Sequence, residues 1–270
     1  MPFLPRRLLL AAPALLLGAP ARAVTLNDSG LKQGGFVVGR AAPGTRLALD
    51  GRAVRVSAAG DFVFGFGRDH AAQARLTITP PSGGAETQVL NIARRQWPTE
   101  SISGLPPAQV TPDAETLARI AREREKLGGI RALESALTGF AEGFTRPAPG
   151  RISGVFGSQR ILNGQPRQPH YGLDFAAPTG TPVIACATGR VTLADGFHFF
   201  GKLIVLDHGH GVNSLYAHLS EITVREGESI AKAQRIGAIG MTGRVTGPHL
   251  HFSLSWFQQW LDPQPVVLPG

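Results

Sequence analysis

The sequence of 270 residues contains a single cysteine, Cys186, so an internal disulfide is excluded. This cysteine lies in an apolar stretch, residues 182–187, where we expect a small buried side chain and no thiol nucleophile. Beyond the first 23 residues, no apolar run is long enough to cross a bilayer. The arginines are scattered, with no basic run, no interleaved aromatics and no nucleic-acid motif. We therefore expect no nucleic-acid partner.

The sequence is instead rich in glycine (34) and proline (21), while 43% of its residues are hydrophobic and 17% are charged. This is the composition of a globular protein, and it favours short strands joined by turns over a bundle of long helices. The length is sufficient for one large domain or two ordinary ones, each with its own core.

The N-terminus has the pattern of a secretory signal peptide. Arg6 and Arg7 precede an apolar run over residues 8–17, and Ala21-Arg22-Ala23 matches a small-x-small cleavage site. We expect residues 1–23 to be removed. The Arg6-Arg7 pair suggests twin-arginine export, but the residues around it do not complete that signal, so the export route stays open. Cleavage removes three arginines and no acids from a chain of net charge +8, so the mature charge is 8 − 3 = +5. A basic exported chain suits acidic partners such as a cell wall or an anionic membrane surface.

Residues 24–98 predict several short strands joined by turns. Asp50-Gly51 between alternating apolar residues is a strong hairpin signal, because glycine tolerates the positive φ of such a turn. Strands are expected at residues 36–38, 45–49, 53–56, 62–64, 75–79 and 88–93. This spacing predicts a small β-sandwich. The segment GGFVVGRAAPGTRLALDG resembles bacterial immunoglobulin-like modules of surface and wall proteins, which implies an architecture and identifies no ligand.

Residues 99–147 predict a linker that contains a helix. Thr111 is expected to cap this helix, with the following proline in the first turn. Apolar residues at helical spacing follow, and Gly128-Gly129 is expected to end the helix. A second short helix is expected over residues 130–140.

Seven of the eight histidines lie after residue 148, and four residues in this part could hold or flank a metal. His170 and Asp174 are four residues apart, and His249 and His251 alternate in a predicted strand, so both rings project from one side of a sheet. Two nitrogens and one oxygen form a common catalytic zinc set that leaves a fourth position for water. Imidazole with carboxylate suits zinc better than calcium or magnesium. The spacing of His170 and Asp174 is common by itself, and the alternating histidine pair is more informative but not decisive.

Three longer sequence blocks make the prediction of a catalytic metal site more specific. They read HYGLDFAAPTGTPV, LDHGHGVNSLYAHLS and GMTGRVTGPHLHFSL. In this order they resemble the three signature blocks of the lysostaphin-type (LytM-type) zinc endopeptidases, over residues 151–264. The resemblance implies a β-rich peptidase domain over residues 148–270, with a groove above an antiparallel sheet.

The resemblance also implies roles for individual residues. His170, Asp174 and His251 would bind one zinc ion, and His218 and His249 would be the catalytic pair. The implied chemistry is hydrolysis by zinc-activated water, with histidines moving the proton and stabilising the oxyanion. Which of the two histidines is the general base stays open.

Other polar residues need separate interpretations. His208 and His210 form a second alternating pair, but the glycines around them indicate a hairpin turn, so we expect a structural role for His208 and exposure for His210. Arg160 and Asn163 shortly precede the first expected ligand and are candidates for substrate binding in the cleft. Arg160 would meet a carboxylate of a wall peptide, with a solvated loop arginine as the alternative.

Together these patterns predict a mainly β protein with a β-sandwich-like N-terminal module, a helical linker and a C-terminal peptidase domain. For a protein exported to the periplasm or cell envelope of a bacterium, the resemblance implies a zinc metalloendopeptidase that hydrolyses D-alanyl-diaminopimelate cross-links of peptidoglycan. Peripheral contact with an anionic membrane or the wall is also expected, and no protein regulator is identified. The alternatives are a non-catalytic peptidoglycan-binding module, an activator of another wall hydrolase, or a structural zinc site, which normally has four protein ligands.

Overall fold

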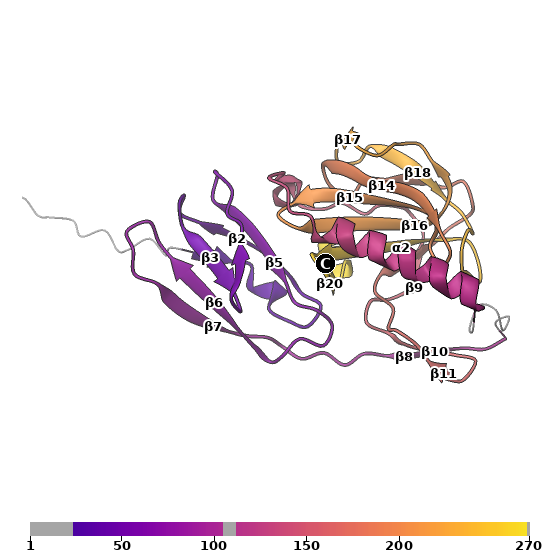
Figure 1. Ribbon diagram of the computed structural model, residues 1–270, viewed down its shortest axis with the longest axis horizontal. Coiled ribbons are helices and arrows are strands. Elements are labelled where there is room, and N and C mark those ends of the chain that lie inside the picture. The colour runs from indigo at the N-terminus through magenta and orange to yellow at the C-terminus, as the bar shows by residue number, and fades with distance from the viewer. Residues whose placement is uncertain (1–23, 105–111, 269–270) are drawn as a thin grey trace, which may run out of the picture.

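The computed structural model describes residues 24–104 and 112–268 (Figure 1). The predicted signal peptide, residues 1–23, lies outside the described residues. The protein is mainly β, as predicted, with antiparallel sheets and few helices. In the described part of the chain, no helix combines the length and the apolar character needed to cross a membrane.

The N-terminal part consists of two small antiparallel sheets. One has the order β1-β2-β5 and the other β4-β3-β6-β7. The expected turn at Asp50-Gly51 joins β3 to β4, and both turn residues have positive φ, 47° and 82°. The likeness to an immunoglobulin-like module stays a prediction. The elements of this part are β1 (Val24–Leu26), η1 (Asp28–Gly30), β2 (Phe36–Ala41), β3 (Arg46–Leu49), β4 (Arg52–Val54), β5 (Asp61–Gly65), β6 (Gln73–Thr79) and β7 (Glu86–Asn91).

The C-terminal part is built on a sheet of 10 strands, whose main path has the order β17-β14-β15-β16-β19-β12-β9. β18 pairs with β13 and β16, and β20 pairs with β19. All of these pairings are antiparallel. The elements are β9 (Arg151–Gly154), β12 (Leu173–Ala176), β13 (Pro182–Ile184), β14 (Gly189–Phe197), β15 (Gly201–Gly209), β16 (Val212–Ile222), β17 (Ser229–Ile230), β18 (Arg235–Ile239), β19 (His249–Trp256), β20 (Gln259–Leu261) and the short helix α3 (Gln264–Val267).

The connector between the two parts contains a strand that the sequence pattern did not predict. β8 (Thr99–Ile102) pairs in parallel with β10 (Gln159–Leu162), which forms a hairpin with β11 (Gln165–Pro166). This three-stranded sheet is separate from the large one. It holds the start of the connector against the β10–β11 hairpin.

Helix α2 (Ala114–Ala132) is longer than predicted and begins at a different cap. Asp113 is the N-cap, and its carboxylate accepts from the backbone amide of Thr116 at 2.7 Å. The expected cap, Thr111, lies outside the described residues. The expectation that Gly128-Gly129 ends the helix was wrong, because the helix continues through both.

Packing explains why the helix survives its two glycines. Leu127 and Arg131 are buried on either side of them, and the Gln258 amide donates to the carbonyl of Gly128 at 2.8 Å. These contacts offset the cost of about 1 kcal/mol that each glycine carries in a helix interior. The second helix predicted over residues 130–140 was also wrong, because this segment forms only the 3-10 turn η2 (Gly139–Glu142) near its end.

Helix α2 lies across one face of the large sheet, over β14, β15 and β16 (Figure 1). Leu127 belongs to the apolar cluster under the helix, with Leu193, Phe197, Leu203, Val205, Leu215 and Ala217. In the sheet register, Leu215 pairs with Ser253 and Ala217 with His251. Directly paired residues place their side chains on the same face, so His251 and Ser253 lie on the face that α2 partly covers.

One buried hydrophobic cluster contains residues from both parts of the chain. Phe62 and Phe64 of β5 belong to the same buried cluster as Trp256 of β19 and Leu261 of β20. Polar contacts add to this junction, since Arg95 forms an ion pair of 2.7 Å with the Asp262 carboxylate, which is buried. The N-terminal sheets are therefore packed directly onto one end of the large sheet, and Figure 1 shows β20 at this junction.

Candidate active site

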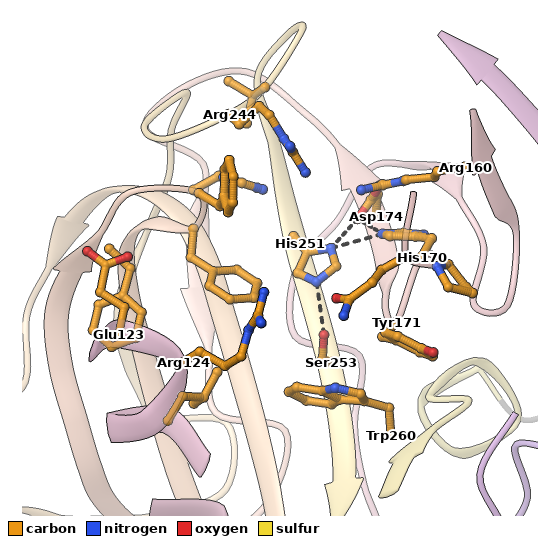
Figure 2. Close-up of a pocket in the computed structure, with 18 of the residues that line it drawn as sticks. Glu123, Arg124, Arg160, His170, Tyr171, Asp174, Arg244, His251, Ser253 and Trp260 are labelled. Carbon is orange, nitrogen blue, oxygen red and sulfur yellow. Dashed lines mark hydrogen bonds and ion pairs between the residues drawn. The ribbon is translucent and has the colours of Figure 1, made fainter. Parts of the chain in front are cut away.

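Three predicted metal ligands meet on the face of the large sheet. Asp174 of β12 and His251 of β19 are directly paired in the register, and His170 comes from the loop before β12. The Asp174 Oδ1 atom lies 2.8 Å from His251 Nδ1 and 3.0 Å from His170 Nε2, and the two ring nitrogens are 3.0 Å apart (Figure 2). All three residues are buried, with at most 8% of their surface exposed.

The donor atoms fit a small tetrahedral cation. For an ion about 2.0–2.1 Å from each ligand, neighbouring ligand atoms lie about 3.3–3.4 Å apart. The observed separations of 2.8–3.0 Å need an outward movement of only a few tenths of an ångström. Two imidazoles with one carboxylate match zinc in their chemistry, and three ligands leave a position open.

Hydrogen bonds orient both histidine ligands. His170 Nδ1 faces the backbone carbonyl of Val155 at 3.0 Å, and because a carbonyl can only accept, this nitrogen carries the proton. His251 Nε2 is 2.9 Å from the Ser253 hydroxyl, which can accept its proton. The remaining nitrogens, Nε2 of His170 and Nδ1 of His251, are then free to bind a metal.

Two glycines allow the ligands to approach each other. A Cβ atom on Gly154 would lie 2.3 Å from Asp174 Oδ2 and 3.1 Å from His170 Cε1. A Cβ atom on Gly172 would lie 2.4 Å from His251 Cε1. Real side chains do not approach so closely, so both positions require glycine for the ligand geometry to form.

The charge states of the buried ligands suit a cation. Burial alone would raise the pKa of Asp174, but Coulombic interactions and hydrogen bonds with the two neighbouring histidines hold that pKa well below 3.8. Burial lowers the pKa of His251 to about 4. At neutral pH the site therefore presents a carboxylate and a neutral imidazole, which are the forms that bind metals.

His218 and His249 lie next to each other beside the ligands, with ring centroids 4.8 Å apart. The ring of His218 is 5.9 Å from that of His251. Nδ1 of His218 faces the carbonyl of Thr242 at 2.9 Å, and Nδ1 of His249 faces the carbonyl of Gly247 at 2.8 Å. Each Nδ1 therefore carries a proton, and each Nε2 can accept one. His218 also has φ of 62°, a backbone conformation that is uncommon outside glycine and is found at functional sites.

All five of these residues line one cavity of about 690 Å³. Figure 2 labels three of them, His170, Asp174 and His251. Helix α2 forms one wall, while β10 and the loop before β12 contribute to the other. Arg160 of β10 lines this cavity, with Nη2 3.9 Å from Asp174 Oδ2 and Nε 3.7 Å from the Glu100 carboxylate of β8. The strand β8 thus brings an acid to Arg160, a contact that the sequence did not predict.

Asn163 does not line the cavity, contrary to expectation. It is exposed in the turn between β10 and β11, followed by Gly164, and the two residues have φ of 47° and 79°. Asn-Gly is the preferred pair for a hairpin turn with positive φ at both positions, so the turn itself explains this asparagine.

The second histidine pair lies away from the cavity. His208 is fully buried and bonded to the Thr188 carbonyl at 2.8 Å and the Ser214 hydroxyl at 2.7 Å, which confirms a structural role. The prediction that His210 is exposed was wrong, since only 2% of its surface is accessible. It lies in the β15–β16 hairpin turn, as expected, but its ring packs 4.8 Å from Phe140 of η2. Cys186 is buried, as predicted.

The sequence analysis missed several residues that shape this site. Ser253 follows His251 by two positions on β19, so period-two alternation was enough to place both on one face. Gly154 and Gly172 carry no comparable signal, because their role depends on contacts with residues from other strands. The same holds for Arg124 and Arg131 of α2, which also line the cavity.

The fold and site define a class: β-rich proteins in which three residues that could hold a metal ion, and two additional histidines, line a cavity over an antiparallel sheet. Residues 168–263 match the model of peptidase family M23, and the chain therefore contains a peptidase M23 domain. This confirms the resemblance inferred from the three sequence blocks.

Peptidoglycan peptidases from other bacteria match less than half of this chain. The peptidoglycan DD-endopeptidase ShyA of Vibrio cholerae is 44% identical over 105 residues, which is 38% of this chain and 24% of ShyA. The DD-carboxypeptidase/endopeptidase Mpg of Neisseria meningitidis is 40% identical over 119 residues, which is 44% of this chain and 27% of Mpg. The chain thus spans about a quarter of the length of these relatives.

A crystal structure from Pseudomonas aeruginosa, described as a peptidase M23, resembles almost the whole chain. It has a TM-score of 0.69 and 27% sequence identity, and the match covers 88% of this chain and 95% of that one. The N-terminal sheets and the large sheet therefore occur together in another protein with the same domain.

Proposed function

We propose that this protein is an exported zinc metalloendopeptidase that hydrolyses peptide cross-links of peptidoglycan. The observation that carries the proposal is the convergence of His170, Asp174 and His251 within 3.0 Å of one another, beside two histidines with an available Nε2. The peptidase M23 domain and relatives named as peptidoglycan DD-endopeptidases support it.

The donor set fits zinc, with His170, Asp174 and His251 as ligands. When bound, zinc supplies a Lewis acid for the scissile carbonyl and lowers the pKa of water toward neutrality. A site with three protein ligands suits this catalytic role better than a structural one. The Val155 carbonyl and the Ser253 hydroxyl hold the two imidazoles in the tautomers that such an ion needs.

His218 and His249 are proposed to transfer the proton and to stabilise the oxyanion during hydrolysis. Burial lowers the pKa of His218 to about 3, so its ring is neutral at neutral pH and Nε2 presents a lone pair. The Thr242 and Gly247 carbonyls fix the two rings by accepting from each Nδ1. One ring can take a proton from water and return it to the leaving amine, and the other can stabilise the oxygen that becomes negative. Either histidine can serve as the general base.

The proposed substrate is the D-alanyl-diaminopimelate cross-link, and the proposed location is the periplasm or cell envelope. A signal-peptide pattern at residues 1–23 and a mature charge of +5 support export toward an acidic wall or membrane surface. The presence of all three ligands and both catalytic candidates disfavours the alternatives of a non-catalytic binding module or an activator.

The direct test is digestion of purified cross-linked peptidoglycan by protein of residues 24–270, followed by mass spectrometry of the fragments. We expect loss of cross-linked dimers, stopped by a chelator and restored by one equivalent of zinc. His218→Ala is the matched control, since it should bind zinc normally and lose most activity. Zinc-loaded wild-type protein that leaves every cross-link intact would refute the proposal, and full turnover by His218→Ala would refute the roles given to the histidines.

A further inference from the structure

Arg131 of α2 is a buried cation that forms no ion pair with an acid of residues 24–104 or 112–268. Only 6% of its surface is exposed, and its Nη2 atom has no hydrogen-bond partner within the described residues. Its Nε atom is 3.3 Å from the Ser255 hydroxyl, and its guanidinium lies 3.5 Å from the centre of the Trp260 ring. Neither contact neutralises the charge.

Such an arrangement is uncommon, because buried arginines are normally paired with acids. Burial lowers the pKa of Arg131 to about 9, which still leaves the side chain protonated at neutral pH. Stacking on an indole favours a cation in this position. The unpartnered Nη2 nevertheless remains available for an acceptor that the described part of the chain does not provide.

Arg131 lines the same cavity as the metal ligands, but at a distance from them. Its partner Ser255 follows His251 by four residues on β19, so the two side chains share a face and are separated by about 14 Å along the strand. A substrate strand lying in the groove would span this distance with about four residues.

Arg124 adds a second positive charge to the same wall of the cavity. It precedes Arg131 by two turns of α2, and Figure 2 shows it reaching from the helix toward the space beside His251 and Trp260. Arg124 has neither an ion pair nor a hydrogen bond with any residue that the structure describes. The neighbouring acid Glu123, by contrast, is bonded to Arg119 and to the His198 amide.

We propose that Arg131, assisted by Arg124, binds a carboxylate of an acidic peptide substrate at the α2 end of the groove. This proposal rests on the proposed function, and it adds that the substrate carries a free carboxylate about four residues from the bond that is cut. A guanidinium fork matches a carboxylate in both charge and geometry, and burial strengthens the pair. Amidation of that carboxylate should therefore weaken binding.

The test measures binding without turnover, in full-length protein kept metal-free by a chelator. The probe is the stem peptide L-alanyl-γ-D-glutamyl-diaminopimelyl-D-alanine, compared with the same peptide carrying amidated carboxylates. Tryptophan fluorescence is the readout, because Trp260 lies against Arg131. We expect the wild type to bind the acidic peptide at least tenfold more tightly, and Arg131→Gln to lose most of this preference.

Further variants separate recognition from a structural role of Arg131. Arg124→Gln should reduce the preference by a smaller factor, and because Arg124 is exposed, its replacement should not disturb folding. Arg122→Gln removes the same charge from an exposed position of α2 that does not line the cavity, so it should leave the preference unchanged. Equal weakening for both peptides in Arg131→Gln, or no preference in the wild type, would overturn the proposal.

The outcome can be separated from that of the proposed function. A preference for the acidic peptide, together with zinc-loaded protein that cuts no cross-link, would leave the carboxylate subsite standing and refute the peptidase. Cleavage of cross-links without any preference between the two peptides would refute the subsite alone.

Discussion

The hydroxyl of Ser253 offers a sharp test of how the metal ligands are held. It is buried, with 1% of the residue exposed, and it lies 2.9 Å from Nε2 of His251. When His251 Nδ1 binds a metal, the ring proton must sit on Nε2, where this hydroxyl accepts it. In the metal-free protein the proton can move to Nδ1, where the Asp174 carboxylate accepts it at 2.8 Å.

Ser253→Ala should therefore penalise the metal-bound state more than the metal-free state. A buried N–H group without a partner costs about 1–3 kcal/mol. Since about 1.4 kcal/mol corresponds to a tenfold change in affinity, we expect zinc binding to weaken by about 10–100-fold. The metal-free protein should lose less stability than this.

The assay is zinc competition with a chromogenic chelator at pH 7.5, alongside thermal unfolding of the chelated protein. Ser220→Ala is the control, because its hydroxyl donates to the Ile239 carbonyl at 2.8 Å on the same sheet and touches no ligand. It should lower stability modestly and leave zinc affinity unchanged. Zinc affinity of Ser253→Ala within twofold of the wild type would show that the hydroxyl does not orient His251.

Three further predictions follow from other contacts. Gly172→Ala should reduce both zinc affinity and activity, because its Cβ would lie 2.4 Å from His251 Cε1; normal zinc binding in a competition assay would contradict this. Cys186 should resist alkylation in the folded protein and react in denaturant, since burial raises its pKa to about 11; rapid labelling of native protein, seen by mass spectrometry, would argue against burial. Burial lowers the pKa of His208 from 6.5, so the unfolded chain takes up a proton first and stability is lost as pH falls below about 6.5. Urea unfolding at pH 7 and pH 5 should show a smaller loss in His208→Gln than in the wild type, and equal losses would refute the assignment.

Local patterns predicted the parts of the fold that depend on near neighbours in sequence. The Asp50-Gly51 hairpin and the alternating strand around His249 and His251 follow from turn chemistry and period-two spacing, and both are present. The end of α2 could not be predicted in this way. Judged by local helix propensity, the two glycines predict an end of the helix. The helix continues because Leu127 and Arg131 are buried against the sheet, and this long-range effect has no local signal.

The same distinction between local and long-range features applies to the candidate site. The proposed metal ligands and the two proposed catalytic histidines stand out by residue type and by motif, so the sequence was sufficient to identify them as candidates. The features that tune the site come from distant segments, such as the Glu100 carboxylate near Arg160 and the approach of α2 to the cavity. The burial of His210 under Phe140 has the same origin. None of these contacts leaves a periodic or local signature.

The core that Phe62 and Phe64 share with Trp256 and Leu261 bears on how the chain responds to heat and to proteases. Two modules with no shared cluster would melt in separate steps, whereas a buried cluster that spans both joins them into one cooperative unit. We expect a single calorimetric transition for the mature protein. A cut in the connector near residue 104 should leave two fragments that stay associated, and a C-terminal fragment prepared alone should expose the apolar surface of β19 and β20 and aggregate.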